Sequence, residues 1–363
     1  MKLLHFADLH LDAPFAWAEP HVARLRRDGQ RRTLDRIVAL GTDQRVDAIL
    51  CGGDLFEQDR VEPDTVEYLR RVFADAGRPV YLAPGNHDWY GPTSPYLRTR
   101  WTPNVRVFTE DHLVPVELAP GLRLWGAAHC APANTPDFFA GFCAEGTAVN
   151  LVLAHASERG LIASEARGKL PHAPFEADEL ERTGINLALL GHYHRPRDEV
   201  RFSYPGNPDP LEFGEDGERG VLLVTIDQSG AFSRQRRTVA ASEVHDKVVD
   251  VGGAQDRNEV ATRVRDAIAG LDGAVRVTLC GELGSTVQLE PGTLQALGHG
   301  LEGFVVQIHV KYAYDLSAIA NEKTVRGQFV RDVLQQIEDE ALRQRVITTG
   351  LRALDGRSDL EVV

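Results

Sequence analysis

The chain has 363 residues, of which 43% are hydrophobic and 26% are charged, and its formal net charge at pH 7 is -13. This length allows a full hydrophobic core and favours two domains, while the composition argues against a disordered chain and against membrane spans. The acidic balance argues against wrapping of nucleic acid by bulk electrostatics, although it allows local basic strips and bound metal ions. Four cysteines without CxxC spacing and an N-terminus unlike a signal peptide favour a cytoplasmic protein.

The first predicted strand covers residues 2–6 and leads directly into Asp8 and His10. If the chain stays extended there, both side chains point to the same face, because strand side chains alternate with a period of two. They are either metal ligands at the end of the strand or a capping Asp and an unrelated surface His. His5 we expect to be a core histidine with satisfied hydrogen bonds.

An arginine-rich helix is predicted over residues 20–40. Its six arginines form either a phosphate-binding surface or a solvated face. A second buried strand, 46–51, follows and ends in two glycines and Asp54. Paired glycines let the backbone turn tightly and bring this carboxylate close to another group.

A second helix, 62–76, and a third strand, 79–83, precede the run Gly-Asn-His-Asp at 85–88. This alternation of strands and helices predicts an α/β domain. Packing alone does not require an amide, an imidazole and a carboxylate in succession, because each costs free energy to bury without a partner. The run therefore indicates a functional loop.

Two later buried strands also end in histidines. The strand predicted at 149–154 is followed by His155, and the strand at 186–190 is followed by Gly-His-Tyr-His. His192 and His194 share one face if the chain remains extended. Near residue 240 the pattern changes, which predicts three parts: 1–240 with the ligand-type residues, a small α/β domain at 241–315, and a helical segment at 316–363.

Ligand-type side chains thus follow five strand ends: Asp8 and His10, Asp54, Asn86 and His87, His155, and His192 and His194. We expect them to gather at one edge of the sheet as a single site, because chance would place only one or two such groups at strand ends. Ligands of this kind without cysteine favour manganese, iron or zinc. Their number exceeds what one ion usually needs, so we expect two ions.

Asp54 is the candidate for a ligand shared by both ions, because it is the central acid and glycines clear space beside it. Two ions about 3.5–4 Å apart suit an in-line displacement at phosphorus, with an activated water as the nucleophile. The residues therefore predict a phosphoesterase that depends on two metal ions.

The order of these motifs over roughly residues 1–230 resembles the calcineurin-like metallophosphoesterase superfamily. Within it, the segments around Asp8, Asp54 and 204–215 are similar to SbcD-type DNA repair exonucleases, and above all to the shorter YhaO-like proteins. The resemblance implies an α/β fold, a four-layer α-β-β-α metallophosphoesterase sandwich with a smaller α/β capping domain and a helical C-terminus.

The resemblance also implies two ligand sets, one of Asp8, His10, Asp54 and His194 and another of Asp54, Asn86, His155 and His192. His87 would not bind metal and would face the scissile phosphate as a catalytic group. We group Asp88 with His87 in the catalytic loop, where it either orients the loop or stabilises a turn. Glu57 stands where relatives often have Asp, so we leave it out of the direct ligands.

Three further residues are candidates for contact with the substrate. Tyr193 and Arg195 flank the paired histidines and are placed to meet substrate phosphates, and His129 follows a strand and is a candidate for the rim of the cleft.

The leading hypothesis is a manganese-dependent DNA exonuclease or endonuclease subunit that acts in repair, with iron or zinc as other possible metals. The alternatives are a phosphodiesterase or phosphatase acting on a small molecule or phosphoprotein, and a scaffold that binds DNA ends or an ATPase. The resemblance implies DNA, a coiled-coil SbcC-type ATPase and a second copy of the chain as partners. An apolar stripe at 325–341 either binds that ATPase or packs on the cap.

Overall fold

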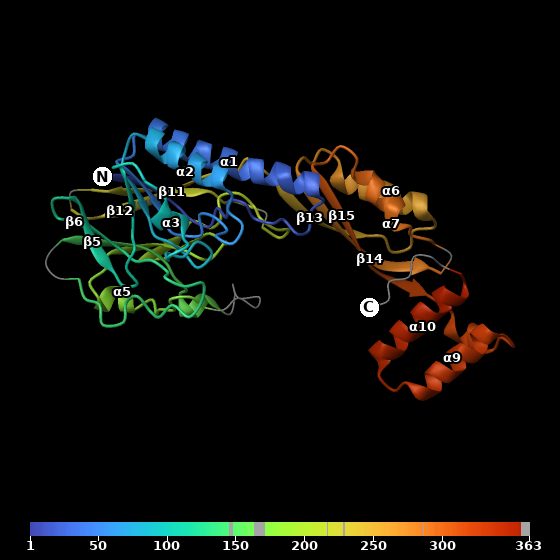
Figure 1. The fold of residues 1–363 in the computed structure, drawn as a ribbon. Coiled ribbons are helices and arrows are strands. Elements are labelled where there is room, and N and C mark those ends of the chain that lie inside the picture. The colour runs from blue at the N-terminus through green and yellow to red at the C-terminus, as the bar shows by residue number, and fades with distance from the viewer. Residues whose placement is uncertain (145–147, 163–170, 216, 228, 286, 357–363) are drawn as a thin grey trace. The chain divides into compact units, whose positions relative to one another are not determined.

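The computed structural model describes residues 1–144, 148–162, 171–215, 217–227, 229–285 and 287–356. The chain divides into two compact units, Met1–Glu243 and Val244–Val363. The described part of the first unit contains two six-stranded sheets, and that of the second unit contains one three-stranded sheet (Figure 1).

The first sheet has the order β12-β11-β1-β2-β3-β4. Its strands are β1 (Lys2–Phe6), β2 (Ala48–Cys51), β3 (Val80–Leu82), β4 (Val105–Val107), β11 (Val221–Ile226) and β12 (Phe232–Arg237). Strands β1 to β4 run parallel, and β11 pairs antiparallel with β1. The carboxyl ends of β1, β2 and β3 therefore lie at one edge of the sheet, where the ligand-type residues follow.

The second sheet has the order β5-β6-β7-β8-β10-β9. Its strands are β5 (Val114–Ala119), β6 (Leu122–Gly126), β7 (Val149–His155), β8 (Leu187–Gly191), β9 (Arg197–Asp198) and β10 (Phe202–Tyr204). Strands β7 and β8 run parallel, and His155 pairs in register with Gly191. This register brings the histidines that follow the two strands together.

Three apolar layers hold the first unit together. Helices α1 (Pro20–Asp43) and α2 (Pro63–Asp75) cover the outer face of the first sheet, where Ile37 and Phe73 share a core. Leucines of both sheets fill a second core between the sheets. Beyond the second sheet, Leu180 of the short helix α5 (Glu179–Arg182) packs with Phe175. The predicted four-layer α-β-β-α sandwich is confirmed; α3 (Pro95–Arg98) and η1 (Arg159–Leu161) are short additions.

The second unit begins with a parallel sheet of β13 (Val244–Asp250), β14 (Ala274–Gly284) and β15 (Gly303–Ala313). Its other elements are α6 (Arg257–Ile268), α7 (Pro291–Gln295), η2 (Ala296–Gly298), α8 (Leu316–Ala320), α9 (Val325–Gln336) and α10 (Glu340–Leu354). The side chain of Asp256 caps α6 by accepting two backbone N–H groups, and Val260 and Val264 pack on the sheet. The predicted α/β part with a helical C-terminus is confirmed as a fold, and residues 357–363 of the predicted helical segment lie outside the described residues.

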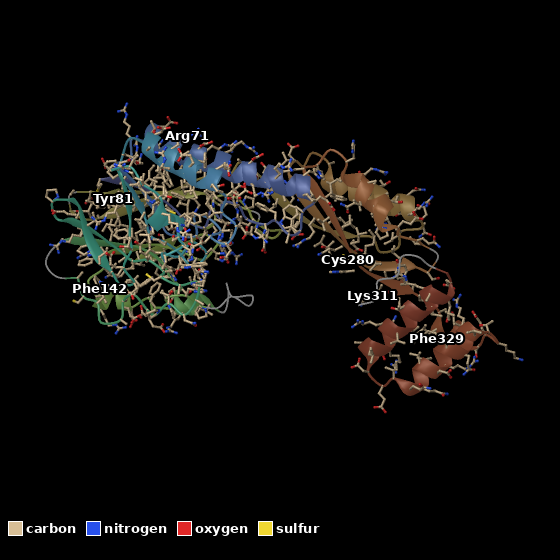
Figure 2. All side chains as sticks on the ribbon, viewed as in Figure 1. Arg71, Tyr81, Phe142, Cys280, Lys311 and Phe329 are labelled. Atoms are coloured by element: carbon tan, nitrogen blue, oxygen red, sulfur yellow. The ribbon has the colours of Figure 1, made fainter. Side chains whose placement is uncertain are left out.

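The apolar stripe predicted at 325–341 is divided between two helices. Helix α9 ends at Gln336, Ile337 is extended, and α10 begins at Glu340. Val333 packs with Ile347 in a small core. The ring of Phe329, which is labelled in Figure 2, lies where any side chain at Gly350 would collide with it. Much of the stripe therefore packs between α9 and α10, whereas Val325 stays exposed. No helix in the described ranges is long and apolar enough to cross a membrane.

Candidate metal centre

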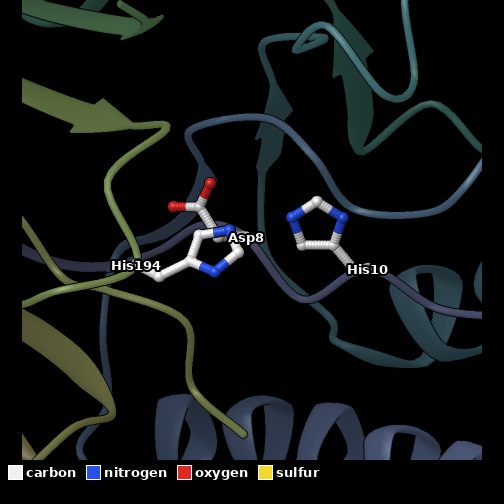
Figure 3. Close-up of side chains that lie close together, drawn as sticks. All are labelled: Asp8, His10 and His194. Atoms are coloured by element: carbon white, nitrogen blue, oxygen red, sulfur yellow. The ribbon is translucent and has the colours of Figure 1, made fainter. Parts of the chain in front are cut away.

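The loops after β1 and β2 are joined by backbone hydrogen bonds. The N–H of Asp8 donates to Gly53 at 3.0 Å, and the N–H of His10 donates to Asp54 at 2.9 Å. From the other sheet, the N–H of His192 donates to the carboxylate of Asp8 at 2.9 Å. Figure 3 shows Asp8 and His10 close to His194, which follows β8. The strand ends therefore gather, but not at the edge of a single sheet as predicted: β1, β2 and β3 belong to the first sheet, and β7 and β8 belong to the second.

The extended geometry under which Asp8 and His10, and His192 and His194, would share a face is not present. Asp8, His10 and Asp54 have φ angles of 55°, 50° and 50°, and His192 has 110°. These residues are in the left-handed region and not extended, so strand alternation does not aim their side chains. Such conformations cost about 1–3 kcal/mol each in residues other than glycine, and they concentrate at functional sites.

Glycines provide the space in which these side chains meet. A Cβ atom on Gly85 would collide with the carboxylate of Asp54, and one on Gly53 would lie 2.6 Å from Nδ1 of His155. Gly53 also has a φ of 98°, which favours glycine. Substitution of either glycine would therefore displace a ligand-type side chain.

Asp54 lies between histidines from both predicted ligand sets. Its Oδ2 is 3.2 Å from Nε2 of His155 and 3.5 Å from Nε2 of His10. Its Oδ1 accepts the backbone N–H of His87 at 2.9 Å. On the far side, Nδ1 of His192 is 3.3 Å from Nε2 of His155. A carboxylate in this position is able to give oxygens to two ions.

Among the residues that the structure describes, three clusters of ligand atoms could hold a cation: Asp8 with His10 and His194, His10 with Asp54 and His87, and Asp8 with Asp54 and His155. Within each cluster the ligand atoms lie within 4.8 Å of one another. The structure thus brings together six of the seven predicted ligands through these clusters and the His192–His155 contact. The seventh, Asn86, is half-buried, and its Oδ1 has no hydrogen-bond partner within the described ranges. His87 also lies within reach of a cation.

Three of the predicted metal-ligating histidines, which are His10, His155 and His194, have Nδ1 held by the protein. Nδ1 of His10 bonds Glu57 at 2.7 Å, Nδ1 of His155 bonds the carbonyl of Gly52 at 2.9 Å, and Nδ1 of His194 bonds Glu215 at 2.8 Å. This leaves Nε2 of each ring for an ion, which is the usual arrangement at protein metal sites. Nε2 of His10 is buried and has no hydrogen-bond partner in the described part of the chain. The residues therefore fit divalent cations.

The electrostatics of the site keep Asp54 and Glu57 ionised. Burial alone raises the pKa of Asp54, but the charge and hydrogen bond of His155 outweigh it and hold that pKa well below its usual value. Burial also opposes ionisation of Glu57, whereas hydrogen bonds from His10 and His87 bring its pKa down to about 2. Both carboxylates are negative at neutral pH and attract cations.

Glu57 is the residue that sequence reasoning left out. Its two carboxylate oxygens bond Nδ1 of His10 and, at 2.9 Å, Nδ1 of His87. Burial lowers the pKa of His87, but the hydrogen bond to Glu57 raises it to about 9. The signal in the sequence is the position of Glu57, three residues after Asp54.

Asp88 is fully buried and does not reach a substrate. Its Oδ1 accepts the N–H groups of Asp54 at 3.1 Å and Gly85 at 2.6 Å. Its Oδ2 accepts the N–H of Leu55 at 2.8 Å and the hydroxyl of Tyr96 at 2.7 Å. These bonds join the loops after β2 and β3. Asp88 therefore supports the loop, which agrees with the expectation that it orients the loop, and its role in catalysis is indirect.

Two of the three predicted substrate contacts are also turned inward. His129 is fully buried, with Nε2 2.6 Å from the carbonyl of His155 and Nδ1 2.7 Å from the hydroxyl of Thr135. The hydroxyl of Tyr193 donates to the carbonyl of Glu158 inside the core. Both rings are therefore buried beside the predicted metal ligands, where a substrate cannot reach them. Arg195 is exposed beside His194 and stays a candidate.

The chain is similar in sequence to known metallophosphoesterases and DNA repair proteins. A profile of the calcineurin-like phosphoesterase family matches residues 1–196. The uncharacterized metallophosphoesterase YhaO of Bacillus subtilis is 26% identical over 75% of this chain and 68% of its own length. The DNA double-strand break repair proteins Mre11 of Aeropyrum pernix and Haloferax volcanii are 28% and 27% identical over 63% and 96% of this chain. The chain spans 58% and 74% of those two proteins.

Proposed function

The chain belongs to the calcineurin-like phosphoesterase family and is a metal-dependent phosphoesterase, and on this premise we propose that it is a two-metal DNA nuclease of a repair pathway. The observation that carries the proposal is the position of Asp54 between His10 and His155. The names of the Mre11 relatives, DNA double-strand break repair proteins, support DNA as the substrate.

Seven residues would hold the ions: Asp8, His10, Asp54, Asn86, His155, His192 and His194. Divalent ions, when bound, lower the pKa of a water nucleophile and neutralise phosphoryl oxygens. The histidine and carboxylate donors suit manganese, iron or zinc, and manganese is our proposal.

His87 is the residue placed to contact the phosphate. Its side chain is 45% exposed, whereas the neighbouring side chain of His10 is 4% exposed. Its backbone N–H donates to Asp54 and its Nδ1 bonds Glu57, so Nε2 is the ring nitrogen that would face the substrate. Held in this way, His87 would donate a hydrogen bond to a phosphoryl oxygen or protonate the leaving oxygen.

The deciding experiment compares three substrates with the purified chain in Mn²⁺: linear duplex DNA, single-stranded DNA and bis(p-nitrophenyl) phosphate. We expect degradation of at least one DNA, and its loss in Asp54→Asn. Hydrolysis of the small phosphodiester with both DNAs intact would contradict the nuclease proposal and favour a small-molecule phosphodiesterase. Activity on no substrate, with metal bound, would favour a scaffold.

The proposed partners are DNA, an SbcC-type ATPase and a second copy of the chain in the cytoplasm. Exposed Leu334 and Leu342 on α9 and α10 support an apolar docking surface for the ATPase. Mixing the purified chain with such an ATPase on a sizing column tests this, and Leu334→Asp should reduce complex formation.

A further inference from the structure

The carboxylate of Glu215 connects a predicted metal ligand to the loop at 207–215. Its Oε1 accepts Nδ1–H of His194 at 2.8 Å. Its Oε2 accepts the side-chain amide of Asn207 at 2.6 Å and the N–H groups of Leu211 at 2.7 Å and Glu212 at 3.2 Å. Three donors fix one oxygen, so the other is held in place against the imidazole.

This loop is anchored to the body of the first unit. The N–H of Asn207 donates to the carbonyl of His194 at 3.2 Å. Oδ1 of Asp209 accepts the hydroxyl of Thr33 on α1 at 2.9 Å and the N–H of Ala241 at 2.8 Å. These hydrogen bonds fix the position of the loop that carries Glu215. A residue that positions a metal ligand requires such a fixed support.

The two predicted metal positions differ in what supports their histidines. His10 and His194 are each held by a carboxylate, Glu57 and Glu215, whereas His155 is held by the neutral carbonyl of Gly52. A carboxylate partner raises the basicity of the imidazole and fixes the proton on Nδ1. The cluster of Asp8, His10 and His194 therefore has two imidazoles whose basicity is raised by a carboxylate.

We propose that Glu215 is a positioning residue that sets the metal affinity of the cluster of Asp8, His10 and His194, an inference that rests on the proposed two-metal site. It acts through His194 by holding the tautomer in which Nε2 carries no proton. Nothing in this role requires Glu215 to touch the ion or the substrate.

The substitution Glu215→Gln tests this role because it reverses the tautomer with little change of shape. The amide oxygen would stay with the three donors from the loop, and the amide NH₂ would then face Nδ1 of His194. That nitrogen would have to accept, which moves the ring proton to Nε2, the nitrogen available to an ion. Glu215→Asp keeps the correct tautomer and shortens the reach.

The experiment titrates metal-free protein with Mn²⁺ by calorimetry. Wild type should bind two ions. Glu215→Gln should bind one ion with wild-type affinity and the other about 10–100-fold more weakly. Glu215→Asp should lie between the two. The matched control is Glu212→Gln, an exposed carboxylate on the same loop, which should behave as wild type.

A second measurement separates this role from simple support of the loop. The melting temperature of the metal-free protein should be the same in wild type and Glu215→Gln, and the stabilisation by Mn²⁺ should be smaller in the variant. Wild-type affinity for both ions in Glu215→Gln would overturn the inference. So would equal weakening of both positions together with a lower melting temperature without metal. Failure of wild type to bind two ions would instead overturn the proposed two-metal site.

Discussion

Oε2 of Glu57 lies 2.9 Å from Nδ1 of His87, and the same carboxylate holds His10 through its other oxygen. One acid therefore fixes both a predicted metal ligand and the predicted catalytic histidine. Glu57→Gln should lower turnover of DNA about 10–100-fold, because an amide has a single oxygen and cannot accept from both rings. The measurement is the initial rate at saturating Mn²⁺. Asp59→Asn, an exposed acid two residues away, should keep the wild-type rate.

His87→Ala should reduce turnover by about 10²–10⁴-fold, the range for loss of a general acid or base. Metal content, measured after dialysis against Mn²⁺, should stay at two ions per chain, because neither proposed ligand set includes this ring. Loss of one ion would show that His87 is a ligand, a role that its place near His10 and Asp54 allows. His112→Ala, an exposed histidine, serves as the control.

Asp88→Asn should lower the free energy of unfolding by more than Tyr96→Phe does. The asparagine would turn an NH₂ group toward the N–H of Leu55 or of Asp54 and Gly85, leaving buried donors unpaired at about 1–3 kcal/mol or more. Tyr96→Phe removes one bond to the same carboxylate. Urea unfolding of the metal-free proteins gives both values. The reverse order would mean that Asp88 does not hold the two loops.

His5 was predicted to have satisfied hydrogen bonds, and this was wrong. It is fully buried, and neither ring nitrogen has a hydrogen-bond partner in the described ranges. Burial, helped by the charge of Arg236, lowers its pKa from 6.5 to about 3. The folded protein therefore holds the ring neutral. Above pH 6.5 the ring is neutral in the unfolded chain as well, so its titration does not change the free energy of unfolding. As pH falls from 6.5 toward 3, the unfolded chain takes up a proton that the folded chain does not, and the free energy of unfolding falls progressively.

His5→Leu should remove the fall in the free energy of unfolding that His5 causes at low pH. At neutral pH the variant should be more stable than wild type, since a buried ring without a partner costs about 1–3 kcal/mol. Its advantage should grow by about 2 kcal/mol between about pH 6.5 and about pH 5, at about 1.4 kcal/mol per pH unit. Urea unfolding of the metal-free proteins at several pH values measures the difference. A difference that does not change with pH would show that His5 has a partner in solution.

Residues near each other in sequence were predicted well. The fold class follows from buried strands alternating with helices, and each strand that was expected to end in a ligand-type residue does so. The prediction failed where a partner is distant in sequence. His155 depends on the carbonyl of Gly52, and His129 turned out to be buried behind His155. No sequence pattern next to His129 or His155 predicts those contacts.

The sequence by itself determined which residue types follow which strands, because strands and tight glycine turns are specified by local patterns. It placed Asp8, Asp54 and Asn86 at one edge, because parallel strands of one sheet end there, but the histidines after β7 and β8 come from the second sheet. Tertiary structure decided how they meet. The left-handed backbone of Asp8 and Asp54, the carboxylates that hold His10 and His194 and the burial of Asp88 all depend on contacts between loops that are distant in sequence. Backbone angles in such loops are set by the neighbours that hold them, and only the folded chain supplies those neighbours.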